Sequence, residues 1–541
     1  MKKTLTNFLL TQLLLVILIA NSLLINADQL NYKAERDHST VRNIIVGSFT
    51  GGWSHLRPLL DISKILVERG YNVTLLSPGS YSSKPEYEKI KHYSIGTNTI
   101  DARKQFEKIV YGKATSSFIS AVIKTISDRY LNQHYVYERV SNEVKPDLFL
   151  CDFVNNEVCF DMAWKLKKPM VSLGVGLTIL EQPPYKSDPL FGCHVNMENE
   201  SFLERLRCFL TPKVIMALSS LPEISKINEI RAKVGIAPTD LYERTKENLY
   251  LSDTFSGFDV PFPSSPILQE IGPIMSDSYP PLSPETKKFL DNHPRTMLVA
   301  FGTQFYVSER NNGILLQSFI EAIENNVLDG VIWGLSNIIL EEIPKTITLS
   351  NGKEFDTIDI INNKHPNIHI LSFAPQFSIL AHENCKVFLS HTGASSANEA
   401  LYNGKPILAL PIALDQHGNA EKLEKFAGVA LTLDKMTLNV EEILIKLQRL
   451  LREEKFKING EKMKFLARIN SKRKHRAADL IEYTIQAHES KEKLNRNYLD
   501  VYLALLSIVL VTLVISVFTI YKLTSLIVAK FLINLVKLKN E

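Results

Sequence analysis

Residues 386–411 read KVFLSHTGASSANEALYNGKPILALP, and this stretch decides the fold class. An apolar run, KVFLS, is followed by a loop of small and polar residues, by a helix-favouring segment and by a second apolar run, ILALP. Short apolar strands separated by helices are typical of a parallel sheet that is covered on both faces. The stretch therefore predicts an α/β fold, with a helix that begins near Ser395.

The same alternation occurs in two halves of the chain, on either side of a stretch with seven prolines, 259–284. Strands are predicted at 43–49, 71–78 and 146–153 before it, and at 296–303, 330–335, 367–373, 386–393 and 406–411 after it. Proline interrupts helices and central strands, so this stretch is interpreted as the connection between domains. We expect two Rossmann-like, doubly wound domains that face each other across a cleft, with a linker between them: 28–274, 275–284 and 285–485.

Composition and common phosphate motifs exclude several classes of function. The chain has 541 residues, 45% hydrophobic and 22% charged, with a net charge of +4, which indicates neither disorder nor a nucleic-acid-binding protein. The sequence has no G-x-x-x-x-G-K-[ST] motif, no G-x-G-x-x-G after the first strand and no Asp-x-Asp pair or C-x-x-C spacing. We therefore expect neither a bound cofactor nor a metal.

Both ends of the chain carry targeting patterns. Residues 1–27 combine Lys2 and Lys3 with an apolar run and a small-residue exit, which predicts a secretory signal peptide, with a retained anchor as the alternative. Residues 499–521 are almost uncharged and long enough to cross a bilayer, whereas a buried core helix is the alternative. The tail, 522–541, is basic and resembles a dilysine retrieval signal. These patterns predict a single-pass type I protein of the endoplasmic reticulum membrane with lumenal domains.

A location in the oxidising lumen would allow the five cysteines to form disulfides and the two sequons to be glycosylated. Five cysteines allow two bridges at most, and Cys193 with Cys208 is the favoured pair. The sequon at Asn199 lies in a polar loop and is the better predicted acceptor. The sequon at Asn72 lies in a predicted strand, and we expect its side chain to be buried.

Several loops follow predicted strands of the second half, where ligands bind in doubly wound sheets. A helix that begins near Ser395 directs unpaired N–H groups at a ligand, Gly393 allows close approach, and His391 adds a hydrogen-bond donor. Glu399 follows Ser396 on the same helix face and suits the hydroxyls of a ribose. The pattern predicts a nucleotide site to which these strand ends contribute: Gly302, Thr303, Phe373, Gln376, His391, Gly393, Ser395, Ser396, Glu399, Asp415 and Gln416.

Residues 373–420, FAPQFSILAHENCKVFLSHTGASSANEALYNGKPILALPIALDQHGNA, resemble the donor-binding signature of the UDP-glycosyltransferases, a family with two facing Rossmann-like domains (GT-B). The resemblance implies that Phe373, in place of the usual tryptophan, stacks on uracil and that Gln376 contacts the base or ribose. It implies that His391, Thr303 and Ser396 meet the diphosphate. Ser395 replaces a frequent asparagine. The resemblance further implies that Glu399 binds the ribose, and that Asp415 and Gln416 bind the donor hexose.

The resemblance also implies a catalytic base in the first half. His55 follows the first strand and matches the family's base, and Asp152 ends a later strand and matches the carboxylate that orients it. The implied reaction is inverting transfer of a hexose, with glucose favoured, from a UDP-sugar to a hydroxyl of a lipophilic acceptor. The segment 174–225 is expected to shape the acceptor pocket. The expected partners are the two substrates and the bilayer, and a homo-oligomer is left open.

Two other functions fit parts of the sequence. GASSA, residues 393–397, is close to the G-x-S-x-G turn of serine hydrolases, although its second glycine and a glycine-rich oxyanion loop are missing. A non-catalytic binding protein of the lumen on the same scaffold is the other alternative.

Overall fold

The structure of the protein is a computed structural model. The residues that it describes are 42–79, 85–97, 107–112, 116–174, 186–187, 189, 192–261, 265–336 and 340–489, with the isolated positions 522, 524 and 528. The chain divides into Met1–Arg42 and Asn43–Glu541, and the fold described below is that of the second part. The predicted signal peptide and the predicted span at 499–521 lie outside the described residues. Within the described part, no helix has both the length and the apolarity needed to cross a bilayer.

The first half of the chain forms a seven-stranded parallel sheet. Its strands, in spatial order, are β3 (Lys91–Ser94), β2 (Asn72–Ser77), β1 (Asn43–Gly47), β4 (Leu148–Asp152), β5 (Met170–Gly174), β6 (Leu249–Ser252) and β7 (Leu268–Glu270). The helices among the described residues of this half are α2 (Trp53–Glu68), α4 (Ser116–Val144), α5 (Glu157–Lys165) and α6 (Phe202–Lys233). β7 lies within the proline-rich stretch and forms an edge of the sheet, where a strand next to prolines is tolerated.

The second half forms a six-stranded parallel sheet. Its strands, in spatial order, are β12 (Ile368–Leu371), β9 (Gly330–Gly334), β8 (Thr296–Ala300), β13 (Cys385–Ser390), β14 (Ile407–Ala409) and β15 (Ala430–Thr432). Its helices up to the end of β15 are α7 (Pro284–Asn292), α8 (Glu309–Glu324), α9 (Thr357–Ile361), α10 (Gln376–Ala381), α11 (Ala394–Asn403) and α12 (Gln416–Glu421). A small antiparallel pair joins β10 (Thr346–Thr348) and β11 (Glu354–Asp356).

Both sheets are covered on both faces, as the continuous apolar runs predict. Within β1, Ile44 and Val46 pack with α2, whereas Ile45 packs with α4 and α5 on the other face. Within β13, Val387 and Phe388 likewise belong to different core clusters. Since successive side chains of a strand point to opposite faces, a strand buried on both faces needs apolar residues throughout. The predicted α/β class with two parallel sheets is confirmed.

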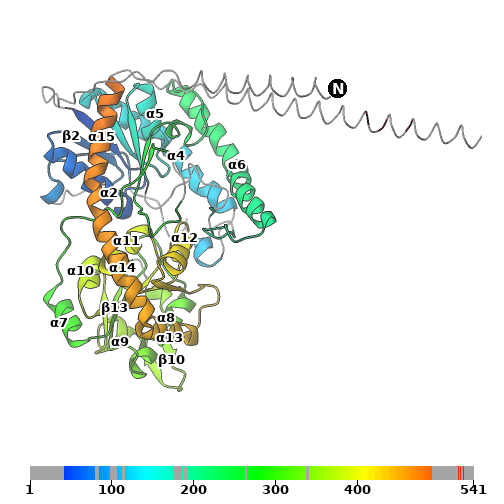
Figure 1. Cartoon of the computed structure of the whole chain (residues 1–541). Helices are drawn as coiled ribbons and strands as arrows, with labels where there is room; N and C mark the ends of the chain where they lie inside the picture. The colour runs from blue at the N-terminus through cyan, green and yellow to red at the C-terminus, as the bar shows by residue number, and fades with distance from the viewer. Residues whose placement is uncertain are drawn as a thin grey trace, which may run out of the picture. The chain divides into compact units, whose positions relative to one another are not determined.

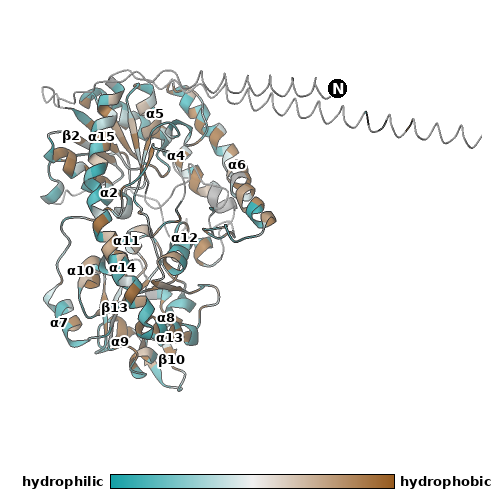
Figure 2. Ribbon diagram, in the orientation of Figure 1, coloured by the Kyte–Doolittle hydropathy of each residue, from teal (hydrophilic) through white to brown (hydrophobic). Residues whose placement is uncertain are grey.

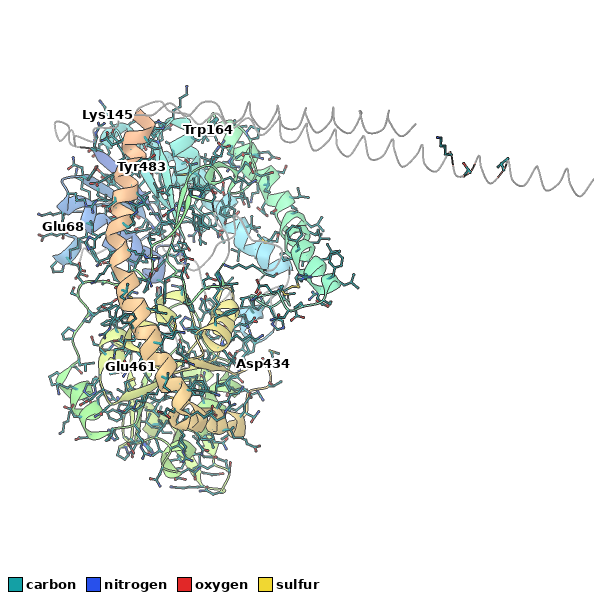
Figure 3. All side chains as sticks on the ribbon, viewed as in Figure 1. Glu68, Lys145, Trp164, Asp434, Glu461 and Tyr483 are labelled. Carbon is teal, nitrogen blue, oxygen red and sulfur yellow. A yellow bond between two sulfur atoms is a disulfide. The ribbon has the colours of Figure 1, made fainter. Side chains whose placement is uncertain are left out.

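Three helices follow the second sheet, α13 (Val440–Arg452), α14 (Glu454–Asn470) and α15 (Lys474–Glu489). α14 packs on α11, whereas α15 packs on α2 and contributes Ile481 to the core of the first sheet. Figure 1 shows α14 and α15 as one continuous orange run. Figure 3 labels Glu68, at the end of α2, and Tyr483, on α15; the two helices are joined there by an ion pair of 2.8 Å between Arg69 and Glu482.

Three local expectations are settled by the described residues. The bridge Cys193–Cys208 is confirmed, and a second bridge, Cys151–Cys159, was not predicted. Asn199 is exposed in a turn, as expected. The expectation that Asn72 is buried was wrong: its side chain is exposed because it is the first residue of β2, beyond the covering helices, and burial begins at Val73.

Candidate active site

The strand order of the first sheet brings two predicted catalytic residues to one place. From β1 the order runs through β2 to β3, and from β4 it runs the other way to β7. The loops after β1 and β4 therefore diverge to opposite sides, and the space between them is where doubly wound sheets bind ligands. His55 lies in the first turn of α2, directly after β1, and Asp152 is the last residue of β4.

His55 and Asp152 are in contact. His55 Nδ1 and Asp152 Oδ1 are 3.3 Å apart, and Asp152 is buried whereas His55 is partly exposed. Asp152 also accepts from the Ser48 hydroxyl, at 3.4 Å, and from the N–H of Val154, at 3.3 Å. If Nδ1–H of His55 donates to Asp152, the lone pair of Nε2 remains to accept a proton, as in a histidine–carboxylate base.

The surroundings of His55 favour its protonated form. Burial alone lowers the pKa of His55, but the charge of Asp152, its hydrogen bond and the charge of Asp415 outweigh that effect and raise the pKa above 6.5. Asp415 comes from the loop before α12, in the second half of the chain. The predicted base and a residue predicted to bind the donor sugar are therefore close enough to interact electrostatically.

The second sheet has the same kind of switch point, between β8 and β13. Gly302 follows β8 and His391 follows β13, and the register places Ala300 beside Ser390 at their ends. A Cβ on Gly302 would lie 2.9 Å from His391 Nε2, and one on Gly393 would lie 2.7 Å from it. A side chain at either position would therefore force His391 to shift, because two loops of backbone close around one imidazole. Gly302 also has φ of 75°, which favours glycine.

His391 is kept neutral. Burial lowers its pKa to about 4, although a backbone contact with Ala300 acts in the opposite direction. Its Nδ1 is buried without a hydrogen-bond partner among the described residues. A neutral imidazole carries one N–H, so His391 is suited to donate to an anion rather than to remove a proton near neutral pH.

The helix that follows His391 begins where the sequence predicts. α11 starts at Ala394 after Gly393, and no side chain caps its first N–H groups. Gln376 opens α10 and donates to Glu399 Oε2, at 2.8 Å, and to Ser396 Oγ, at 3.3 Å. The structure therefore brings His391, Gly393, Ser396, Glu399 and Gln376 together around one helix N-terminus, an arrangement that binds phosphate in other proteins.

The remaining predicted donor residues differ in exposure. Phe373 follows β12 and is 64% exposed, so its ring is open to stack on a base. Thr303 is also exposed. Gln416 is buried instead, and its side-chain carbonyl accepts from the N–H groups of Ile412 and Ala413, at 2.8 and 2.9 Å. Gln416 thus shapes the loop before α12, and its predicted contact with the sugar stays a prediction.

Two loop residues beside the site adopt left-handed backbone conformations without being glycine. Thr392 has φ of 63° and Leu414 has φ of 54°, and each directly precedes or follows a predicted donor residue. Such conformations are unfavourable and persist where the surroundings impose them, often at binding sites. The Thr392 hydroxyl donates to the carbonyl of Gln416, at 2.8 Å, which ties the two loops together.

The serine-hydrolase alternative finds no support at Ser395. The Ser395 hydroxyl donates to the carbonyl of Ser54, at 3.4 Å, rather than to an imidazole. The strained residue of the turn is Thr392, whereas a hydrolase of this type strains the nucleophile itself. Ser395 instead contacts α2, the helix that carries His55.

A family model described as "UDP-glucoronosyl and UDP-glucosyl transferase" matches residues 194–537. The chain belongs to this family. A relative named UDP-glycosyltransferase 1, from Phaeomoniella chlamydospora, is 33% identical over 70% of this chain and 76% of its own length. UDP-glucuronosyltransferase 2B17 from Homo sapiens is 24% identical over 76% of this chain and 78% of its own length.

Solved structures agree on the fold. The structure of CalG4, the calicheamicin glycosyltransferase, has a TM-score of 0.56 and 17% identity, and the match covers 82% of this chain and 98% of that one. The glycosyltransferase of kitacinnamycin has a TM-score of 0.57, 17% identity and coverage of 82% and 100%. The chain is thus a UDP-glycosyltransferase with the GT-B fold, an enzyme that transfers a sugar from UDP.

Sequence reasoning missed two residues of this glycosyltransferase site. Ser48, directly after β1, donates to Asp152, and Arg57, on α2, donates to Glu399 Oε1 at 2.5 Å. Arg57 carried a usable signal, because it is a lone cation in the apolar stretch HLRPLLDI. A cation on the buried face of a helix requires a partner, but the sequence does not say which carboxylate supplies it.

Proposed function

We propose that this enzyme is an inverting, metal-independent hexosyltransferase that moves glucose from UDP-glucose to a hydroxyl of a lipophilic acceptor. The observation that carries the proposal is the His55–Asp152 pair, 3.3 Å apart, at the switch point of the first sheet, with Asp415 acting on the same imidazole. A base whose pKa is raised by two carboxylates is suited to take a proton from an alcohol during attack.

The proposed reaction is a single displacement. Nε2 of His55 takes the proton of the acceptor hydroxyl while the acceptor oxygen forms a bond to C1 of the hexose. The bond between C1 and the β-phosphate oxygen breaks, and its electron pair leaves with UDP. Attack from the side opposite the phosphate inverts C1, so an α-linked donor gives a β-glycoside. Base catalysis of this kind contributes about 10²–10⁴-fold, or roughly 3–5 kcal/mol.

The leaving UDP would be stabilised by the second site. The N-terminus of α11, the Ser396 hydroxyl and the N–H of neutral His391 offer hydrogen-bond donors to the diphosphate. These groups supply the hydrogen bonds on which the proposed mechanism without a metal depends. Glu399, Asp415 and Gln416 would then bind the hydroxyls of ribose and hexose.

Glucose is favoured over a hexuronate because the basic residues that flank α12 are already engaged. Lys422 lies 2.9 Å from Asp259 Oδ2, and Lys186 lies 3.1 Å from Asp259 Oδ1. Lys435 donates to the carbonyl of Ile412, at 2.7 Å. A hexuronate carboxylate is best met by a cation that is not already paired. The named relatives include glucuronosyltransferases, so the donor must be tested directly.

A lumenal, membrane-anchored setting is part of the proposal. The two disulfides support an oxidising compartment. Figure 2 shows apolar positions along α6, and residues 202–225 of this helix belong to the segment 174–225 that we expect to shape the acceptor pocket. Its exposed apolar side chains are Phe202, Leu203, Leu206, Leu210, Val214, Leu218 and Leu221. An exposed apolar face of this kind supports contact with lipid or with lipophilic acceptors. Loss of a glycan in Asn199→Gln would test the lumenal location.

The deciding experiment incubates the full-length enzyme in detergent with UDP-glucose, UDP-galactose, UDP-N-acetylglucosamine and UDP-glucuronate and a panel of lipophilic alcohols. We expect acceptor-dependent UDP release that is largest with UDP-glucose and is unaffected by EDTA. The anomeric configuration of the product, read by NMR, should be β. Release with UDP-glucuronate alone, an α product, or loss of activity in EDTA that a divalent metal restores would each overturn one part of the proposal.

A further inference from the structure

A buried ion pair joins the helix of the predicted base to the helix of the predicted nucleotide site. Arg57 on α2 donates through Nη1 to Glu399 Oε1 on α11, at 2.5 Å. The two side chains are only 7% and 6% exposed. The residues are 342 positions apart in the chain and belong to different halves of the fold. The pair therefore links the catalytic side to the donor side across the two halves.

Arg57 stays charged in this setting. Burial alone lowers the pKa of Arg57, but the charge of Glu399, the presence of Tyr279, the hydrogen bond that Arg57 donates to Glu399 and the charge of Asp61 raise it. The guanidinium also lies 5.7 Å from the centroid of the Tyr279 ring, which stacks on Phe377 beside Gln376. A cation that is paired on one side and packed against an aromatic ring on the other has little freedom to move.

A second contact joins the same two helices, α2 and α11. Pro58 lies inside α2 and has no N–H, so it cannot donate to the carbonyl of Ser54, four residues earlier. That carbonyl accepts from the Ser395 hydroxyl of α11, at 3.4 Å. His55 lies between Ser54 and Arg57, and both neighbours contact α11. The position of the imidazole relative to α11 is thus set by contacts on both sides of it.

Glu399 is held from two directions. Its Oε1 accepts from Arg57 and its Oε2 accepts from Gln376, at 2.8 Å. A carboxylate oxygen has more than one lone pair, so both oxygens can also accept from ribose hydroxyls. A ribose bound to Glu399 would then contact the same carboxylate that pairs with Arg57 on α2, the helix that carries His55.

We propose that Arg57 is a positioning residue: by pairing with Glu399 it fixes the turn of α2 that carries His55 against the donor helix α11. The inference rests on the proposed function, because it assigns Arg57 a role in bringing base and sugar donor together. Removal of the pair would leave the base and the donor site intact but misplaced relative to each other. A displacement of the order of 1 Å between reacting groups can cost about 10²-fold in rate.

The first arm of the test compares Arg57→Met with Arg69→Met in the full-length enzyme. Arg69 is a matched control, because it directly follows α2 at the opposite end of the helix and also makes an ion pair, with Glu482 at 2.8 Å. We expect Arg57→Met to lower kcat about 10- to 100-fold while the Kd of UDP changes less than about 3-fold. Arg69→Met should leave kcat within about 2-fold. Rates are normalised to the number of UDP-binding sites, measured by calorimetry.

The second arm asks whether Arg57 acts through Glu399. In an E399Q background, Arg57→Met should cost less than about 3-fold more in kcat, because the pair is already broken. Arg57→Lys keeps the charge and should restore part of the rate lost in Arg57→Met. Equal rates for Arg57→Met and Arg69→Met, or a full additional loss in the E399Q background, would overturn the inference.

Two further outcomes are separable. If Arg57→Met fails to fold, the Arg57→Lys and E399Q enzymes decide: we expect E399Q to lower kcat and Arg57→Lys to retain more activity than E399Q, and the reverse order overturns the inference. If the wild-type enzyme binds UDP but transfers no sugar, the proposed function fails and this inference fails with it. A fully active wild-type enzyme with an equally active Arg57→Met variant overturns only the inference.

Discussion

Each of the two sheets of this enzyme places a histidine at its switch point, His55 after β1 and His391 after β13, and the two histidines have opposite properties. In the first sheet, His55 is surrounded by the carboxylates of Asp152 and Asp415, which raise its pKa above 6.5. In the second sheet, His391 is enclosed by glycine backbone and its pKa falls to about 4. The strand order fixes where each imidazole lies, but its neighbours decide whether it is suited to accept a proton or to donate a hydrogen bond.

The difference matches the two demands of sugar transfer. The acceptor alcohol must lose a proton, which requires a basic imidazole whose protonated form is stabilised by nearby carboxylates. The departing diphosphate must gain hydrogen bonds, and a carboxylate beside it would repel it. Under the proposed function, one fold that is used twice supplies a base on one side and an anion site on the other.

The strongest way to break this comparison is to remove the base. We expect His55→Ala to lower kcat about 10²–10⁴-fold while the Kd of UDP stays within about 3-fold, because His55 acts on the acceptor. UDP release and calorimetry measure the two quantities. His92→Ala, on the remote strand β3, serves as the control and should keep normal turnover. Normal turnover in His55→Ala would reject its role as the base.

Removal of the second histidine, His391, should change the Kd of UDP more than kcat, which is the reverse of the result expected for His55→Ala, and the effect should be smaller. His391→Ala loses a hydrogen bond to a charged group, worth about 1.5–3 kcal/mol, so the Kd of UDP should rise about 10- to 100-fold. His369→Ala, a buried histidine of β12 that lies 3.3 Å from the Thr286 hydroxyl, controls for loss of packing. Equal UDP affinities in the two variants would show that His391 does not contact the diphosphate.

The pH profile sharpens the comparison further. The wild-type rate should fall as pH drops through the raised pKa of His55, above pH 6.5, because the imidazolium cannot accept a proton. Asp152→Asn removes the charge that raises the pKa of His55 and leaves burial, which lowers this pKa, as the largest effect, so the acid limb should move to lower pH. Measurement of kcat between pH 5 and pH 9 at saturating UDP-sugar tests this. An acid limb that stays in place would mean that Asp152 does not set the pKa of His55.

The smallest expected effect concerns Asp253, which follows β6 and lies 3.5 Å from Asn398 of α11. Burial raises its pKa to about 7, although the N–H of Ile274 and the charge of Arg57 oppose that shift. The pKa of the Asp253 carboxyl is therefore higher in the folded enzyme than in the unfolded chain. Its contribution to the stability of the fold is complete below the pKa of the unfolded chain and is lost as the pH rises through about 7. In the wild-type enzyme, the free energy of unfolding should fall between pH 5 and pH 8. Asp253→Asn should make this fall smaller by an amount on the order of 1 kcal/mol, which thermal unfolding at each pH measures.

A matched control for that measurement is Asp128→Asn, an exposed carboxyl of α4 that pairs with Lys226 at 2.9 Å. Its substitution should leave the pH dependence of stability as in the wild-type enzyme. If Asp253→Asn and Asp128→Asn behave alike, the burial of Asp253 has no measurable consequence.

The sequence predicted the strands that border the site better than the elements away from it. Strands β1, β4, β8 and β13, which border the site, are continuous apolar runs and were all predicted. Strands β2, β9, β12 and β14 were also predicted, whereas the following were not: β3, β5, β6, β7, β10, β11 and β15. Helix α2 begins at Trp53 and continues through Pro58, which is tolerated because the carbonyl left without its N–H partner, that of Ser54, is bonded elsewhere. No local pattern could indicate that contact, since Ser395 lies 341 positions away.

By itself, the sequence determined the α/β class, the strands after which His55, Asp152 and His391 lie, and the helix that begins after Gly393, because hydrophobic periodicity and glycine placement are local properties. The tertiary structure alone decided the partners: which carboxylate meets Arg57, which charges raise the pKa of His55 and which backbone encloses His391. Electrostatic interactions depend on distance in space and on burial, and both are set only when the two halves of the chain come together.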